Sequence, residues 1–111
     1  MGSLTAPPRY RLRVTLTHPP QLADPVISSL VGATSLSRGR TYARKAAVFN
    51  VEWNPKNLEL KGKVQGNRDA PYRTKASFKQ GVDGLRLEWG YCSCPMAYNC
   101  KHVAALLLES P

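Results

Sequence analysis

The residues best suited to chemistry lie close together near the end of this 111-residue chain. All three cysteines and one of the two histidines fall within residues 92–102. They are Cys92, Cys94, Cys100 and His102. Thiolate sulfur and imidazole nitrogen are the ligands that zinc takes in closed, four-coordinate structural sites. The sequence therefore predicts one structural zinc ion as the cofactor, held by these four side chains.

The spacing of the four ligands constrains the local backbone. They form two pairs, Cys-x-Cys and Cys-x-His, and each pair is tighter than the spacing of two to four residues common in zinc fingers. Pro95 follows the first pair directly and supplies the fixed φ of a sharp turn. Asn99 is a favourable N-cap for a predicted helix over residues 101–109. This arrangement would place the second pair at the positive end of the helix dipole, which favours a thiolate.

Other roles for the cysteines fit the pattern less well. A disulfide within the first pair would be badly strained, and three cysteines cannot all pair. A redox site more usually has two residues between its cysteines, and closed coordination also disfavours a redox or metal sensor. Three buried core cysteines beside an incidental histidine remain the alternative to a zinc site.

The ligand segment resembles the SWIM zinc-binding domain, whose pattern is CxC, a short loop, and CxH at the start of an apolar helix. Pro95, Lys101 between the last two ligands, and the apolar run 103–107 all agree with that pattern. The resemblance places the SWIM motif at about residues 81–109.

Upstream segments extend this resemblance. Residues 38–44, and residues 64–66 with Pro71-Tyr72, look like the segment that precedes the motif in bacterial SWIM proteins. Many of those proteins carry the domain beside a SWI/SNF-type helicase-like ATPase. The resemblance thus implies an accessory module of such an ATPase, with nucleic acid or another protein as its partner.

Hydrophobic periodicity predicts an α+β fold. We expect a disordered tail over residues 1–9 and a single zinc-stabilised domain over residues 10–111. The predicted elements are a strand at Tyr10–Leu16, a helix from Asp24-Pro25 to about Leu30, a helix from about Ser35 to Lys45, and four alternating strands between residues 47 and 91. Short turns rich in Gly, Asn, Pro and Asp join the four strands, which predicts an antiparallel meander with one apolar face.

The alternation also assigns the large aromatic residues. The alternation groups Phe49 with Trp53, and Tyr91 with Trp89, on the apolar side of the strands. Trp53, Phe78 and Trp89 are predicted to lie in the core. Tyr98 lies in the loop between the two ligand pairs, where its ring could stack on a base or cap the zinc site. The apolar helix at the end of the chain must be buried, or belong to something larger.

Charge indicates the class of partner. Sixteen Lys and Arg residues against seven Asp and Glu residues give a formal net charge of +9, which favours a polyanion such as DNA. The predicted nucleic-acid contacts are Lys61, Lys63, Arg73, Lys75 and Lys79 on the strands, and Arg38, Arg40, Arg44 and Lys45 on the second helix. Such contacts would go mainly to phosphates and would read little sequence. Solvated basic surfaces remain the alternative for both sets.

No motif in the sequence indicates catalysis. A nucleophile–base set, paired carboxylates and a phosphate-binding glycine loop do not occur, so we expect a non-catalytic module. The alternative to nucleic-acid binding is a protein-interaction module that docks through its apolar C-terminal helix. The chain has no apolar run long enough to span a membrane and no signal peptide, so we expect a cytoplasmic protein without membrane contact.

Overall fold

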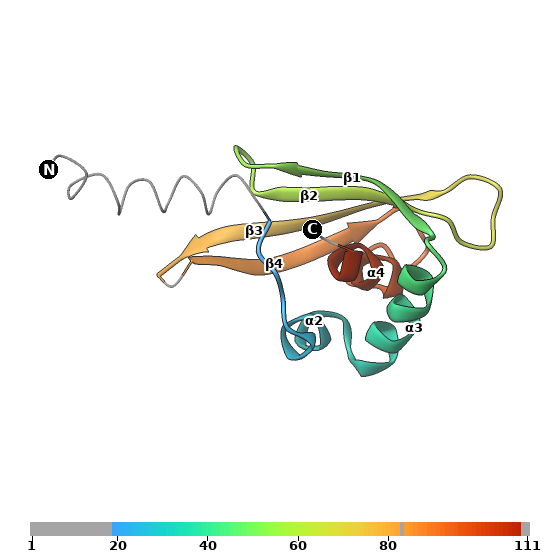
Figure 1. Cartoon of the computed structure of the whole chain (residues 1–111), viewed down its shortest axis with the longest axis horizontal. Coiled ribbons are helices and arrows are strands. Elements are labelled where there is room, and N and C mark those ends of the chain that lie inside the picture. The colour runs from blue at the N-terminus through green and yellow to red at the C-terminus, as the bar shows by residue number, and fades with distance from the viewer. Residues whose placement is uncertain (1–18, 83, 110–111) are drawn as a thin grey trace, which may run out of the picture.

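A computed structural model describes residues 19–82 and 84–109 (Figure 1). The described elements are α2 (Asp24–Val31), α3 (Ala33–Arg44), β1 (Val48–Asn54), β2 (Glu59–Val64), β3 (Tyr72–Gly81), β4 (Gly84–Cys92) and α4 (Lys101–Glu109). The four strands form an antiparallel sheet in the order β1-β2-β3-β4. The predicted α+β class, four-strand meander and C-terminal helix are confirmed.

The helices lie on one side of the sheet. Helix α4 packs against all four strands, and α2 and α3 pack against α4, as Figure 1 shows. We call the sheet surface under α4 the inner face and the opposite surface the outer face. The outer face has no helix over it in the part of the chain that the structure describes.

The two N-terminal helices lie close to their predicted positions. Helix α2 begins at Asp24 itself, so that Ala23 and not Asp24 occupies the N-cap, and Pro25 lies in the first turn. Helix α3 begins two residues before the predicted Ser35. Proline is favoured in a first turn because the amide it removes has no partner inside the helix.

Helix α4 is buried on nearly every side, as its composition requires. Residues 102–107 are all buried. Two glycines allow the close packing around it. A Cβ at Gly39 of α3 would lie 2.7 Å from the Ala104 side chain, and a Cβ at Gly90 of β4 would lie 2.3 Å from that of Val103. The helix is therefore the centre of the core and not an exposed apolar surface.

Two β-bulges change which aromatic side chains enter the core. Across β1 and β2, Phe49 pairs with Lys63 but Glu52 pairs with Lys61, so β1 carries one extra residue between them, where Asn50 has a positive φ of 54°. Before the bulge, Val48 is buried and Phe49 is exposed. The predicted alternation, which placed Phe49 on the same face as Val51 and Trp53, is wrong at this residue.

The bulge in β4 has a larger effect. Phe78 pairs with Leu87 and Ser77 pairs with Trp89, so Glu88 is the extra residue. A one-residue shift turns every following side chain to the opposite face. Gly90 and Cys92 therefore face inward, whereas Trp89 and Tyr91 face outward, each 37% exposed. The prediction that Trp89 lies in the core is wrong.

The other two aromatic assignments hold. Trp53 and Phe78 pack on the inner face with an edge-to-face contact between their rings, 5.6 Å from centroid to centroid. The predicted tail at residues 1–9 and the predicted strand Tyr10–Leu16 lie outside the described residues. Within those residues, the structure has no helix with the length and apolar character needed to cross a membrane.

Candidate zinc site and basic sheet face

The four predicted ligands meet at one end of the sheet. Cys92 is the last residue of β4, Cys94 lies in the following loop, Cys100 directly precedes α4, and His102 lies in its first turn. All four side chains are buried, and their ligand atoms lie within 4.8 Å of one another. The structure thus brings the whole predicted set together; we call it the Cys3His cluster.

Three of the six distances between ligand atoms match the edges of a tetrahedral zinc site, and all six are within 4.8 Å. Cys94 Sγ and Cys100 Sγ are 3.6 Å apart, and His102 Nδ1 is 3.6 Å from Cys92 Sγ and 3.7 Å from Cys100 Sγ. Zinc–sulfur bonds of about 2.3 Å and zinc–nitrogen bonds of about 2.0–2.1 Å imply edges of about 3.6–3.8 Å in a tetrahedron. With four protein ligands the site is closed, and the ion it takes is one structural zinc.

The loop between the ligand pairs is held by backbone hydrogen bonds. The Cys92 N–H donates to the Ala97 carbonyl at 2.6 Å, and the Ala97 N–H donates to the Cys94 carbonyl at 3.0 Å. Asn99 donates its N–H to the Gly90 carbonyl at 3.0 Å, and its Oδ1 accepts the Gly90 N–H at 2.8 Å. Ala97 and Asn99 have positive φ values, which the tight loop requires.

These bonds correct the prediction that Asn99 caps the helix. Asn99 binds β4, and Cys100 is the residue next to the first turn of α4. The Cys100 carbonyl accepts the Ala104 N–H at 3.1 Å, and the Cys100 thiol accepts a hydrogen bond from the Val103 N–H. A side-chain acceptor that takes the amide three residues ahead is the usual N-cap arrangement. A zinc ligand therefore also caps the helix.

The pKa values of the Cys92 and Cys100 thiols are shifted in opposite directions. The pKa of Cys100 is lowered to about 3, first by a hydrogen bond with Cys92, with His102 and Val103 acting in the same direction and burial opposing them. The pKa of the Cys92 thiol is raised, first by the same hydrogen bond and then by burial. Metal binding requires deprotonated cysteines, so a cation held in the cluster would stabilise both thiolates.

Aromatic side chains fix the His102 ring. Tyr72 stacks on it at 4.5 Å between centroids, and Tyr42 of α3 packs against it at 5.1 Å. The Arg68 guanidinium lies 4.2 Å above the Tyr72 ring and extends this stack. The orientation of the histidine ligand is thereby set by β3 and α3, outside the ligand segment itself.

The comparison with protein families agrees with this geometry. Residues 81–110 match the family model of the SWIM zinc finger. This segment is a SWIM zinc finger. No curated protein and no solved structure gives a significant match to the chain. The family match begins at residue 81, so the likeness of residues 38–44 and 64–66 to SWIM proteins stays a prediction. A SWIM zinc finger is a small binding module and is generally non-catalytic.

The sheet that leads into the SWIM zinc finger carries most of the predicted nucleic-acid contacts. Four of them, which we call the basic quartet, lie on the two central strands of the outer face. They are Lys61 and Lys63 of β2 and Arg73 and Lys75 of β3. In the register, Lys61 pairs with Lys75, and Lys63 pairs with Arg73. Like charges therefore stand directly opposite each other at two successive positions.

Lys79 and the acidic residues complete the charge pattern of the outer face. Lys79 pairs with Arg86 of β4, a third like-charge pair, and Arg86 is a basic residue of this face that was not among the predicted contacts. Glu52 pairs with Lys61, and Glu59 lies 3.7 Å from the Lys75 ammonium. The basic side chains outnumber the acidic ones on this face. A hollow of about 300 Å³ opens beside Lys61, Lys63 and Arg73, at the bulge of β1.

Aromatic side chains adjoin the basic quartet on the outer face. Trp89 and Tyr91 of β4 face outward together with Tyr98 of the loop, and we call these three residues the aromatic trio. Tyr98 does not line the hollow at the Cys3His cluster; its ring packs against the other two, and Tyr72 covers the histidine ligand instead. Of the two predicted roles for Tyr98, the structure therefore excludes the cap on the zinc site.

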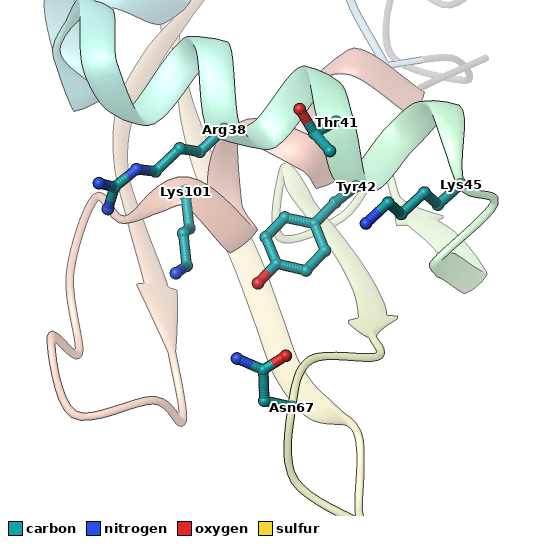
Figure 2. A pocket seen from close by; sticks show the side chains of 6 residues that line it. All are labelled: Arg38, Thr41, Tyr42, Lys45, Asn67 and Lys101. Atoms are coloured by element: carbon teal, nitrogen blue, oxygen red, sulfur yellow. The ribbon is translucent and has the colours of Figure 1, made fainter.

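The predicted basic helix α3 lies on the other side of the sheet, and its four cations have different surroundings. Arg40 pairs with Asp24 at 2.6 Å, whereas Arg44 is exposed. Arg38 and Lys45 line a hollow of about 220 Å³ that the sequence did not predict, together with Thr41, Tyr42, Asn67 and Lys101. Figure 2 shows α3 side chains along one rim of this hollow, Lys101 of α4 on another, and Asn67 of the β2–β3 loop opposite.

Proposed function

We propose that this chain is a zinc-stabilised nucleic-acid-binding module that contacts phosphates through the outer face of its sheet. It would act as an accessory to a SWI/SNF-type helicase-like ATPase, the setting that the SWIM resemblance implies. The zinc finger anchors one end of the sheet and α4 fills the core. The role of the zinc site is structural, and we assign binding to the surface that the site supports.

The observation that carries the proposal is the run of like-charge pairs across β2 and β3. Directly opposed like charges destabilise an antiparallel sheet. The pairs Lys61–Lys75 and Lys63–Arg73 stand side by side on a face that none of the described helices covers. Phosphates laid across the strands would neutralise both pairs at once, and the backbone of a nucleic acid offers a regular row of them.

Two further features bear on the choice of partner. The hollow beside Arg38, Lys45 and Lys101 offers a second cationic position, on the helical side of the sheet, where it cannot share one straight backbone path with the basic quartet. Burial of residues 102–107 weighs against the alternative of protein docking through the apolar helix α4.

The test is the salt dependence of binding to a labelled DNA duplex by the zinc-loaded protein. Each phosphate contact contributes about −0.9 to the slope of log affinity against log salt concentration. The variant Lys61→Gln with Lys63→Gln should flatten the slope by about 2 units if both lysines contact phosphate. The matched control, Arg44→Gln with Lys45→Gln, removes the same charge from α3 and should leave the slope nearly unchanged.

Four results are informative. Flattening by the β2 pair alone supports the outer face. Equal flattening by both pairs would mean a diffuse charge effect, and a larger effect of the α3 pair would move binding to the helical side. Absence of binding at low salt, to the duplex and to single-stranded DNA alike, would contradict the proposal as a whole.

A further inference from the structure

The outer face carries more than charge, because the aromatic trio is a packed group of exposed rings. Tyr98 meets Trp89 at 6.1 Å and Tyr91 at 5.8 Å between centroids, with interplanar angles of 68° and 69°. Tyr98 is 59% exposed, and the other two rings are each 37% exposed. Edge-to-face packing holds the three rings in fixed positions before any ligand arrives, which lowers the entropy lost on binding.

The register places this trio beside the basic quartet. Tyr91 pairs with Lys75, and Lys75 pairs in turn with Lys61 on the next strand. The Lys75 ammonium also lies 5.6 Å from the centroid of the Trp89 ring. Neighbouring strands are about 5 Å apart, so two cationic rows run parallel to the aromatic one at about 5 and 10 Å. Aromatic and cationic side chains thus occupy adjacent strips of one open face.

Such a pair of strips suits one class of ligand. Bases that stack on aromatic side chains, with the backbone held by Lys and Arg, are the common mode of binding to single strands. In a duplex the bases are already stacked and paired, and a flat sheet face reaches only the backbone. We propose that the outer face binds single-stranded nucleic acid, with bases on the aromatic trio and phosphates on the basic quartet. This inference rests on the proposed function and narrows its ligand to unpaired strands.

The zinc site is linked to this surface by the loop that carries Tyr98. The loop from Pro95 to Asn99 joins the two ligand pairs, and Tyr98 bridges to Tyr91 at the edge of the sheet. The hydrogen bonds of Asn99 to Gly90 fix the same loop to β4. The zinc ion, by closing this loop, would hold the third ring of the trio in place.

The test compares labelled oligo-dT with a duplex of the same length, both titrated with zinc-loaded protein. Wild-type protein should prefer the single strand, and binding should quench tryptophan fluorescence, with the quenching lost in Trp89→Phe. Each stacked base contributes roughly 1–3 kcal/mol, so Tyr98→Ser should weaken oligo-dT binding at least fivefold while leaving duplex binding unchanged. The salt slope should stay the same, because no charge is removed.

The control is Met96→Ser, which removes an exposed apolar side chain from the same loop, 63% exposed and outside the trio. It should bind oligo-dT like the wild type. Tyr91→Leu is a second test in case Tyr98→Ser alters the loop. This variant removes a ring of the trio from strand β4 and not from the loop, and it should also weaken oligo-dT binding.

Different binding results would contradict the inference and the proposed function. Equal binding to both nucleic acids, weakened by Lys61→Gln with Lys63→Gln but not by the ring variants, would overturn the stacking surface and keep phosphate binding. No binding to either nucleic acid at low salt would overturn both, and would point to a protein partner for the exposed rings.

Discussion

The Cys3His cluster and the outer face of the sheet differ in how their polar groups are matched. In the cluster, four buried ligand atoms lie within 4.8 Å of one another, where one cation can bind all of them. On the outer face, two acidic residues adjoin Lys61 and Lys75, but cations still face cations across β2 and β3, and aromatic rings remain exposed. Polar groups that find partners within the chain stabilise the fold. Charged and aromatic side chains that lack complementary partners on an open surface are available to bind another molecule. The first region accounts for the fold, and the second for the proposed function.

The largest expected effect is that of removing the metal. Structural zinc contributes roughly 10–16 kcal/mol in zinc-finger peptides, which matches or exceeds the total stability of a typical domain. We therefore expect chelator-treated protein to lose the near-UV circular dichroism signal and the α4 helix, and to regain both when zinc is added back. Native spectra and an unchanged melting temperature after verified zinc loss would contradict the account of the cluster.

A smaller expected effect is the difference in stability loss between tryptophan variants on the inner and outer faces of the sheet. The chain has two tryptophans, and only Trp53 packs in the core, against Phe78. Large-to-small changes of buried aromatic residues cost about 3–5 kcal/mol, so Trp53→Ala should lower the free energy of unfolding by about 3 kcal/mol. Trp89→Ala should lower it by about 1 kcal/mol, since that ring lies at the surface. Urea unfolding of both variants checks this, and equal losses would place both rings in the core.

How far the sequence predicts this molecule depends on how local each feature is. The four ligands lie within residues 92–102, so their types and spacing were enough to predict the site, and the model of the SWIM family agrees. The helices and the strand order also follow from local periodicity and short turns. Only the cap of α4 was wrong in this region, because Asn99 binds Gly90 of β4, a contact that helix-capping preference does not include.

The outer face was predicted in part, because it depends on the register of four strands. Alternation placed Lys61, Lys63, Arg73 and Lys75 outward, as the structure has them. It failed for Phe49, Trp89 and Tyr91 because single extra residues at Asn50 and Glu88 reverse the alternation. A bulge of one residue leaves no clear signal in the alternation of apolar and polar residues along a strand sequence. The same limit hid the aromatic trio and, with it, the ligand class that we infer.

The most direct test of the central claim is to map the bound strand on the zinc-loaded protein by NMR. Oligo-dT is titrated into ¹⁵N-labelled protein, and shifts of backbone amides and of the two tryptophan indoles are followed. The account predicts shifts at Lys61, Lys63, Arg73 and Lys75, and at the indole of Trp89 but not that of Trp53. Shifts confined to α3 around Arg38 and Lys45, or none at all at low salt, would contradict it.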